Sequence, residues 1–227
     1  ALQSGQNYTG LGALETGILM EIQKKAAKRI SQNLWNGNGS PDTWTFTGWH
    51  DRLLAANFGT SNVGTTTPTA GGSAGTDAEG VYNIVQALIN TAVADVDFAS
   101  DVEAGNVYIV MSPKEKEFLR QNYLKLYDQS LYANGLGNLQ SNVFGSFMFP
   151  GTNIPVYIQS SLTGTGTIIL SRKGNQVLAV DNASDFTALD IWLADDHDTL
   201  RWKLRFKMGV GWRDLTGNSV KYWGAAS

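Results

Sequence analysis

The chain has 227 residues, no cysteine and a formal net charge of -3, and only 16% of its residues are charged. These values exclude disulfides, thiolate catalysis and cysteine-ligated metals, and they argue against a general nucleic-acid binder. No run of about 18 apolar residues occurs, so we expect no membrane-spanning segment. Ordinary soluble domains carry about 25% charged residues. Because interface cores are depleted in charge, this composition favours a protein whose surface is largely covered by neighbours.

A long helix is predicted near the start of the chain. Residues 1–12 are rich in Gly, Gln and Asn and predict no regular structure. Over residues 13–33, apolar side chains recur every four positions, at Ile18, Ile22, Ala26 and Ile30. The second half of this helix carries four cations, where we expect the helix dipole to favour them. They are Lys24, Lys25, Lys28 and Arg29. The simplest interpretation is a solvated face; the alternative is a contact with nucleic acid or an acidic partner.

The next segment is polar and lacks the groups needed for a core. Residues 43–47 alternate polar and aromatic residues, as in an edge strand. Residues 57–75 are almost wholly Gly, Thr, Ser, Ala and Asn, too poor in apolar groups to pack alone. We therefore expect this segment to be ordered by a neighbouring subunit. The contact candidates in it are Asn57, Thr65, Thr66 and Thr67.

Two capped helices are predicted to bracket one buried strand. The capping-box sequence of residues 76–79 predicts a helix start, and a one-sided apolar pattern continues beyond it. That pattern consists of Val81, Ile84, Val85, Leu88, Ile89 and Ala92. An acidic, glycine-containing break over 95–105 precedes a strand at 107–111 that should be buried on both faces. Ser112 and Pro113 then predict the cap and first position of a second helix, with Phe118, Leu119 and Tyr123 on its apolar face.

Strand patterns dominate the rest of the chain. Residues 143–149 and 154–158 predict short strands around a turn, and 167–170 with 176–180 predict a hairpin. Further strands are expected at 186–193 and 200–210. The last of these alternates apolar residues with a cationic row of Arg201, Lys203, Arg205 and Lys207. This cationic row is either a solvated face or a surface that docks on an acidic neighbour, such as residues 95–103 or 195–198.

Candidate catalytic and metal-binding groups are weak. The best cluster is Asp195, Asp196, His197 and Asp198, which could hold a divalent metal but is more simply a polar turn between strands. His50 and Asp51 are a second candidate, yet no nucleophile-turn pattern accompanies them. No phosphate-binding glycine motif follows a strand. We therefore expect no catalytic activity, no resident metal and no cofactor.

The order of these elements resembles the major capsid proteins of tailed bacteriophages with the Hong Kong 97-like fold. The resemblance implies an α+β fold with an N-terminal arm and helix at 1–42, an extended loop at 43–75, and a spine helix over 76–97 within 76–128. An axial-domain segment at 129–166 and return strands of the axial and peripheral domains at 167–227 would follow. Residues 153–158 (Asn-Ile-Pro-Val-Tyr-Ile) are similar to a Gly-Ile-Pro-Val-like strand of that family. The chain is short for the family, and its extended-loop segment has no lysine, so cross-linking by isopeptide bonds is not expected.

The resemblance implies a structural subunit of an icosahedral virion capsid, assembled in the bacterial cytoplasm. Its partners would be copies of itself in pentamers and hexamers, packaged double-stranded DNA bound without sequence specificity, and portal, scaffolding or decoration proteins. An encapsulin-type nanocompartment shell shares the fold and is one alternative. The other is a secreted β-rich carbohydrate-binding module, in which Trp35, Trp44, Trp49 and Trp212 would stack on sugars.

Overall fold

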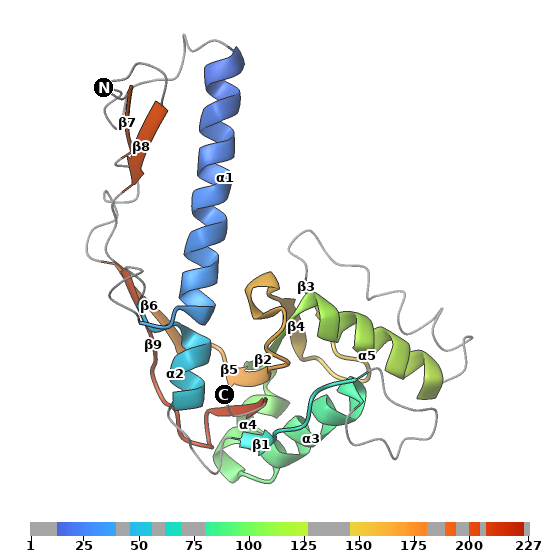
Figure 1. Cartoon of the computed structure of the whole chain (residues 1–227). Helices are drawn as coiled ribbons and strands as arrows, with labels where there is room; N and C mark the ends of the chain where they lie inside the picture. The colour runs from blue at the N-terminus through green and yellow to red at the C-terminus, as the bar shows by residue number, and fades with distance from the viewer. Residues whose placement is uncertain are drawn as a thin grey trace. The chain divides into compact units, whose positions relative to one another are not determined.

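The computed structural model in Figure 1 describes residues 13–39, 46–55, 62–69, 80–126, 146–180, 189–193, 200–204 and 208–224. The chain divides into two compact units. One comprises residues 1–48 and 177–211, and the other comprises 49–176 and 212–227. The chain therefore leaves the first unit, forms most of the second, and returns to each unit once more.

The first unit contains the longest helix in the described part of the chain. This helix, α1, spans Ala13–Asn36, and Gly37 N–H closes it by donating to the Asn33 carbonyl at 3.0 Å. The predicted helix is thus confirmed and runs three residues further. Strands β6 (Gln176–Val180) and β9 (Met208–Trp212) form one two-stranded sheet, and β7 (Leu189–Leu193) and β8 (Leu200–Leu204) form another.

The second unit is built on a six-stranded mixed sheet with the order β1-β10-β5-β2-β4-β3. The strands are β1 (Asn62–Gly64), β2 (Val107–Met111), β3 (Ser146–Met148), β4 (Pro155–Ile158), β5 (Ile168–Arg172) and β10 (Val220–Trp223). Every residue of β2 is buried, which confirms the prediction of a strand covered on both faces. Strands β3 and β4 pair antiparallel around the predicted turn.

Among the described residues, four helices and one 3-10 turn accompany this sheet. They are α2 (Trp49–Ala55), α3 (Val81–Val93), α4 (Val96–Glu103), α5 (Pro113–Leu126) and η3 (Ser160–Leu162). The predicted apolar face of α3 is confirmed, because Val81, Ile84, Val85, Leu88 and Ala92 are buried in one cluster with side chains of β2, β4 and β5. Ile89 packs at the edge of this cluster. No helix in the described part of the chain could span a bilayer.

The predicted start and length of the helix at 76–97 are wrong. Helix α3 begins at Val81, after an N-cap at Gly80 that makes no side-chain capping bond, while residues 76–79 lie outside the described residues. It ends at Val93 and not near residue 97. The predicted break at 95–105 instead contains α4, because Asp95 Oδ1 accepts hydrogen bonds from the N–H groups of Asp97 and Phe98. The fully buried Phe98 ring anchors this short helix.

The predicted hairpin of residues 167–180 is also wrong. Strand β5 pairs with β2 on one edge and β10 on the other, so neither edge is open to β6. Strand β6 pairs with β9 instead. Of the long strand predicted at 200–210, the described residues form β8 and β9, which pair with different strands, β7 and β6, while residues 205–207 lie outside the described part. Of the strand expected at 43–47, Thr47 forms a single bridge with Asn38, and residues 43–45 lie outside the described part.

Strand β1 was not predicted. It lies inside the polar segment 57–75 and pairs in parallel with β10, and Gly224 N–H extends this pairing by donating to the Gly64 carbonyl at 2.9 Å. A Cβ at Gly64 would lie 2.4 Å from the Trp223 ring, so only glycine allows this approach. The expectation that the whole segment needs a neighbouring subunit is therefore wrong for residues 62–69. Backbone pairing and the Trp223 ring supply what the segment's own side chains lack.

Candidate functional surfaces

His50 is a structural residue in this fold. It is 7% exposed on α2, and its Nε2 lies 2.9 Å from Thr167 Oγ1, which is itself buried. Burial lowers the pKa of His50 below 6.5, although Asp51, with Oδ1 3.4 Å from Nδ1, opposes this shift. A neutral imidazole bonded to a buried hydroxyl connects α2 to the start of β5 and has no open side for a substrate.

The described residues contain no candidate metal-binding cluster. Within the described ranges, no group of three or more His, Asp or Glu side chains could hold an ion. The predicted cluster of Asp195, Asp196, His197 and Asp198 lies outside those ranges, so it stays a weak candidate.

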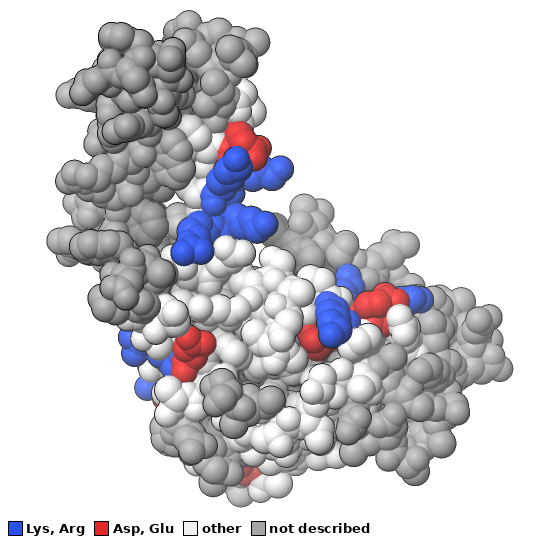
Figure 2. Space-filling model, viewed as in Figure 1, with Lys and Arg blue, Asp and Glu red and all other residues white. Residues whose placement is uncertain are grey.

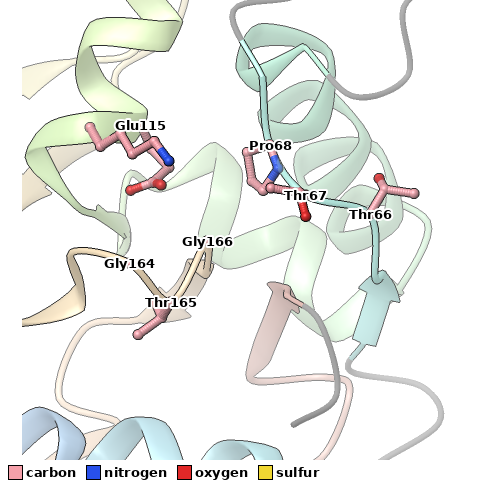
Figure 3. Close-up of a pocket in the computed structure, with 8 residues that line it drawn as sticks. Thr66, Thr67, Pro68, Glu115, Gly164, Thr165 and Gly166 are labelled. Carbon is pink, nitrogen blue, oxygen red and sulfur yellow. The ribbon is translucent and has the colours of Figure 1, made fainter.

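A pocket of about 210 Å³ lies between the start of α5 and the segment after β1 (Figure 3). Thr66, Thr67 and Pro68 line one side, Lys114 and Glu115 another, and the loop 164–166 completes it. The Glu115 carboxylate accepts a hydrogen bond from the Ser112 hydroxyl, whose oxygen in turn accepts from Lys114 N–H at 3.1 Å. Ser112 thus caps the first turn of α5 and Glu115 holds its hydroxyl in place, so the buried carboxylate of the pocket already has a structural role.

The structure describes three of the four contact candidates in the polar segment. Thr65, Thr66 and Thr67 are exposed, while the Thr66 carbonyl accepts a hydrogen bond from Trp223 Nε1 at 2.8 Å. The backbone at Thr66 is thus held by Trp223 of β10, while the three side chains stay accessible. Asn57 lies outside the described residues.

For the predicted cationic row, the structure describes the backbone of two of the four residues. Arg201 and Lys203 lie on β8, where the antiparallel register sets Lys203 opposite Asp190 and Arg201 opposite Trp192. Arg205 and Lys207 lie outside the described residues. A docking role for this row stays a prediction.

The acidic stretch proposed as its complement is partly engaged within its own unit. Asp95 caps α4 and is the carboxylate whose charge acts on Lys221 of β10. Asp101 Oδ2 lies 2.6 Å from Arg172 Nε, an ion pair that joins α4 to the end of β5. Two of the carboxylates in residues 95–103 therefore have intramolecular roles.

A basic face is present on α1. Lys24, Lys25, Lys28 and Arg29 are all exposed, and Figure 2 shows basic side chains gathered over α1 with acidic atoms beside them. Glu21 Oε1 lies 3.9 Å from Lys25 Nζ. No basic residue lies in the last turn of α1, so the expected support from the helix dipole is wrong.

Exposed apolar side chains occur in several places. On β6, Val177, Leu178 and Val180 are each at least 40% exposed, and at the junction of α3 and α4 Val93 and Val96 are 48% and 86% exposed. Strand β6 thus presents apolar groups on both faces, which a solvated surface strand avoids. Such surfaces suit a protein that is covered by neighbours.

The candidate tryptophans that the structure describes, Trp35, Trp49 and Trp212, do not form the exposed platforms that a sugar-binding module needs. Trp35 is 9% exposed, and Trp212 Nε1 donates a hydrogen bond to the Trp49 carbonyl at 2.9 Å. Trp49 and Trp212 are half-buried, and Trp44 lies outside the described residues. The three placed indoles are engaged in packing within the protein.

The described part of the chain is a mixed helix and sheet structure, and comparison with solved structures shows the fold of a phage-like capsid protein. The chain is similar to the capsid of a native gene transfer agent (GTA) particle, with a TM-score of 0.56 and 19% identity over 100% of this chain and 71% of that chain. It also matches the capsid of an empty GTA particle at a TM-score of 0.46 and 14% identity, with the same coverage. No family model and no curated protein matches the sequence.

Proposed function

We propose that this chain is a structural subunit that self-assembles into a closed icosahedral shell enclosing double-stranded DNA, without chemistry of its own. The observation that carries the proposal is the likeness to a capsid structure over 100% of this chain. The low charge content and the exposed apolar groups of β6 support it, because both fit a surface that other copies cover.

The two-unit division supports a revised assignment within the Hong Kong 97-like plan. Helix α1 has 24 residues and α3 has 13, so α1 suits the spine position better than the segment 76–97 does. Residues 177–211 belong to the same compact unit as α1. We assign this unit to the peripheral domain, and the sheet unit of 49–176 and 212–227 to the axial domain.

This assignment changes the role of residues 43–75. In the family order the extended loop precedes the spine helix, whereas these residues follow α1. The pairing of β1 with β10 also supports a place for residues 62–64 in the axial sheet. The exposed Thr65, Thr66 and Thr67 then become candidate contacts between neighbouring axial domains in a pentamer or hexamer.

The test is direct visualisation of assembly. The full chain would be expressed, purified and concentrated, and then imaged by negative-stain electron microscopy with its mass measured by light scattering. We expect closed shells of uniform diameter built from five-fold and six-fold clusters. A chain that stays monomeric at all concentrations and salt conditions would contradict the proposal.

The enclosed DNA needs a second measurement. Particles isolated from the cells that naturally produce them should contain double-stranded DNA that resists added nuclease until the shell is disrupted. Shells that contain protein cargo and no DNA would instead support the encapsulin-type alternative.

A further inference from the structure

The four cations of α1 form one compact surface on the helix. Residues 24, 25, 28 and 29 occupy an arc of about 140° and a length of about 7.5 Å, because each residue advances a helix by about 100° and 1.5 Å. All four side chains are exposed, and Lys24, Lys28 and Arg29 have no ion-pair partner among the described residues. We call Lys24, Lys25, Lys28 and Arg29 the basic face.

The basic face is unusual for this chain. The protein as a whole has a net charge of -3, whereas among the described residues the ion-pair partner of these four cations is Glu21, which is one turn from Lys25. Like charges spaced three to five residues apart on one helix repel each other and destabilise an isolated helix slightly. An anionic ligand bound to this face would remove that repulsion.

Two kinds of anionic macromolecule could supply this charge, and the structure favours nucleic acid over an acidic segment of another copy. In the most acidic described segment, residues 95–103, two of the four carboxylates are engaged, since Asp95 caps α4 and Asp101 pairs with Arg172. Engaging either of these in a contact between subunits would break an intramolecular interaction, and the two exposed carboxylates that are left, Asp97 and Glu103, do not match four cations. A DNA backbone carries one negative charge for about every 1.7 Å of its axis, which suits several closely spaced cations at once.

The side chains on this helix also indicate how DNA would be bound. The face presents ammonium and guanidinium groups, and the exposed positions around it include no aromatic side chain. Such groups contact phosphates and carry no sequence information, since base recognition needs side chains inserted into a groove or stacked on bases. The expected binding is therefore independent of sequence and strongly dependent on salt.

We propose that the basic face of α1 binds the phosphate backbone of double-stranded DNA without sequence specificity and thereby places α1 at the inner surface of the shell. The location in the shell rests on the proposed function, but the binding itself does not.

The experiment measures binding of the full chain to a fluorescein-labelled 30-base-pair duplex by fluorescence anisotropy at several salt concentrations. The test variant is Lys24→Gln/Lys28→Gln/Arg29→Gln, in which three exposed side chains lose their charge. The matched control is Lys114→Gln/Lys173→Gln/Arg213→Gln, which removes three exposed cations from the sheet unit. Circular dichroism would establish that each variant retains the helix content of the wild type.

Each phosphate contact contributes about one unit to the slope of log affinity against log salt concentration. We expect the test variant to bind more weakly and to lose about three units of that slope, and the control to keep most of it. Glu21→Gln should bind more tightly than the wild type, because it removes the one carboxylate of the face. Two duplexes of unrelated sequence should give equal affinities.

Several outcomes would overturn the proposal. Equal losses in the test and control variants would mean that net charge alone determines binding. Unchanged affinity of the test variant would exclude the basic face, and preference for a polyglutamate competitor over DNA would favour an acidic protein partner. Failure of the wild type to form shells would contradict the proposed function and would leave these binding measurements interpretable in their own right.

Discussion

Asn122 of α5 caps the first turn of α3: its Oδ1 accepts a hydrogen bond from the backbone N–H of Tyr82 at 2.9 Å. The N-cap residue Gly80 has no side chain that could satisfy this donor. A Cβ at Gly80 would lie 2.8 Å from the same Oδ1, so the glycine is also what lets α5 approach. The start of α3 is therefore determined by a residue 40 positions away.

We expect Asn122→Ala to lower the free energy of unfolding by about 1–3 kcal/mol, because it leaves a buried N–H without an acceptor. For a chain of this size each kcal/mol corresponds to about 2–4 °C in the melting temperature. Urea titration and thermal melting measure both. Gln121→Ala, at a half-buried neighbouring position whose side chain bonds only to Glu117 of the same helix, is the control and should change stability by no more than about 0.5 kcal/mol.

Gly80→Ala tests the close approach. The backbone at Gly80 has φ -64° and is open to any residue, so any destabilisation must come from the contact with Asn122. We expect a cost of about 1–3 kcal/mol. In the double variant Gly80→Ala/Asn122→Ala the two costs should be less than additive, because the smaller residue 122 makes room for the new methyl group. Additive costs would show that the two residues do not constrain each other.

Leu88→Asp should prevent folding. Leu88 is fully buried in the α3 cluster, and an unpaired carboxylate there costs several kcal/mol, comparable with the whole stability of a domain. Val93→Asp on the same helix is the control, since Val93 is 48% exposed and should accept the charge. Soluble yield and a melting transition are the measurements. A normally melting Leu88→Asp protein would contradict the assignment of the buried face.

Stability should fall as the pH decreases below 6.5 because of His50. Burial lowers the pKa of His50 in the folded protein, so below 6.5 the unfolded chain binds the proton more readily than the folded one does. The stabilisation is complete above that pH and is lost as the pH falls, at no more than about 1.4 kcal/mol per pH unit. Urea midpoints of His50→Gln should depend less on pH between 5.2 and 6.5 (roughly the range above carboxylate titration) than those of the wild type. His197→Gln removes the other of the two histidines and should keep the wild-type dependence.

Lys203→Glu/Lys207→Glu tests the docking role of the cationic row. The backbone register sets Asp190 opposite Lys203, so the variant puts like charges opposite each other, at a cost to the subunit of no more than about 1 kcal/mol. Small contacts repeated across a shell should make particle yield fall more clearly than melting temperature, with a steeper dependence on salt. Lys173→Glu/Arg213→Glu is the control. Unaltered particle yield at both low and high salt would contradict the docking role and favour a solvated surface.

Local patterns in the sequence were sufficient to predict several helices and strands. The period of the apolar residues in 81–92 identified the buried face of α3, and the unbroken apolar run of 107–111 identified a strand covered on both faces. Ser112 and Pro113 identified the start of α5, where the cap bond is made within four residues. In each case the groups that stabilise the element are neighbours in the chain, so their spacing alone carries the information.

The remaining features depend on contacts between distant residues, and only the tertiary structure decided them. Strand β1 lies in a segment without a strand pattern because its stability comes from pairing with β10 and from the Trp223 ring against Gly64. The hairpin expected at 167–180 does not form because β2 and β10 occupy both edges of β5. Helix α3 starts at Val81 because Asn122 supplies the cap. Sequence spacing cannot predict such partners, because backbone donors are satisfied by whichever acceptor the fold brings within reach.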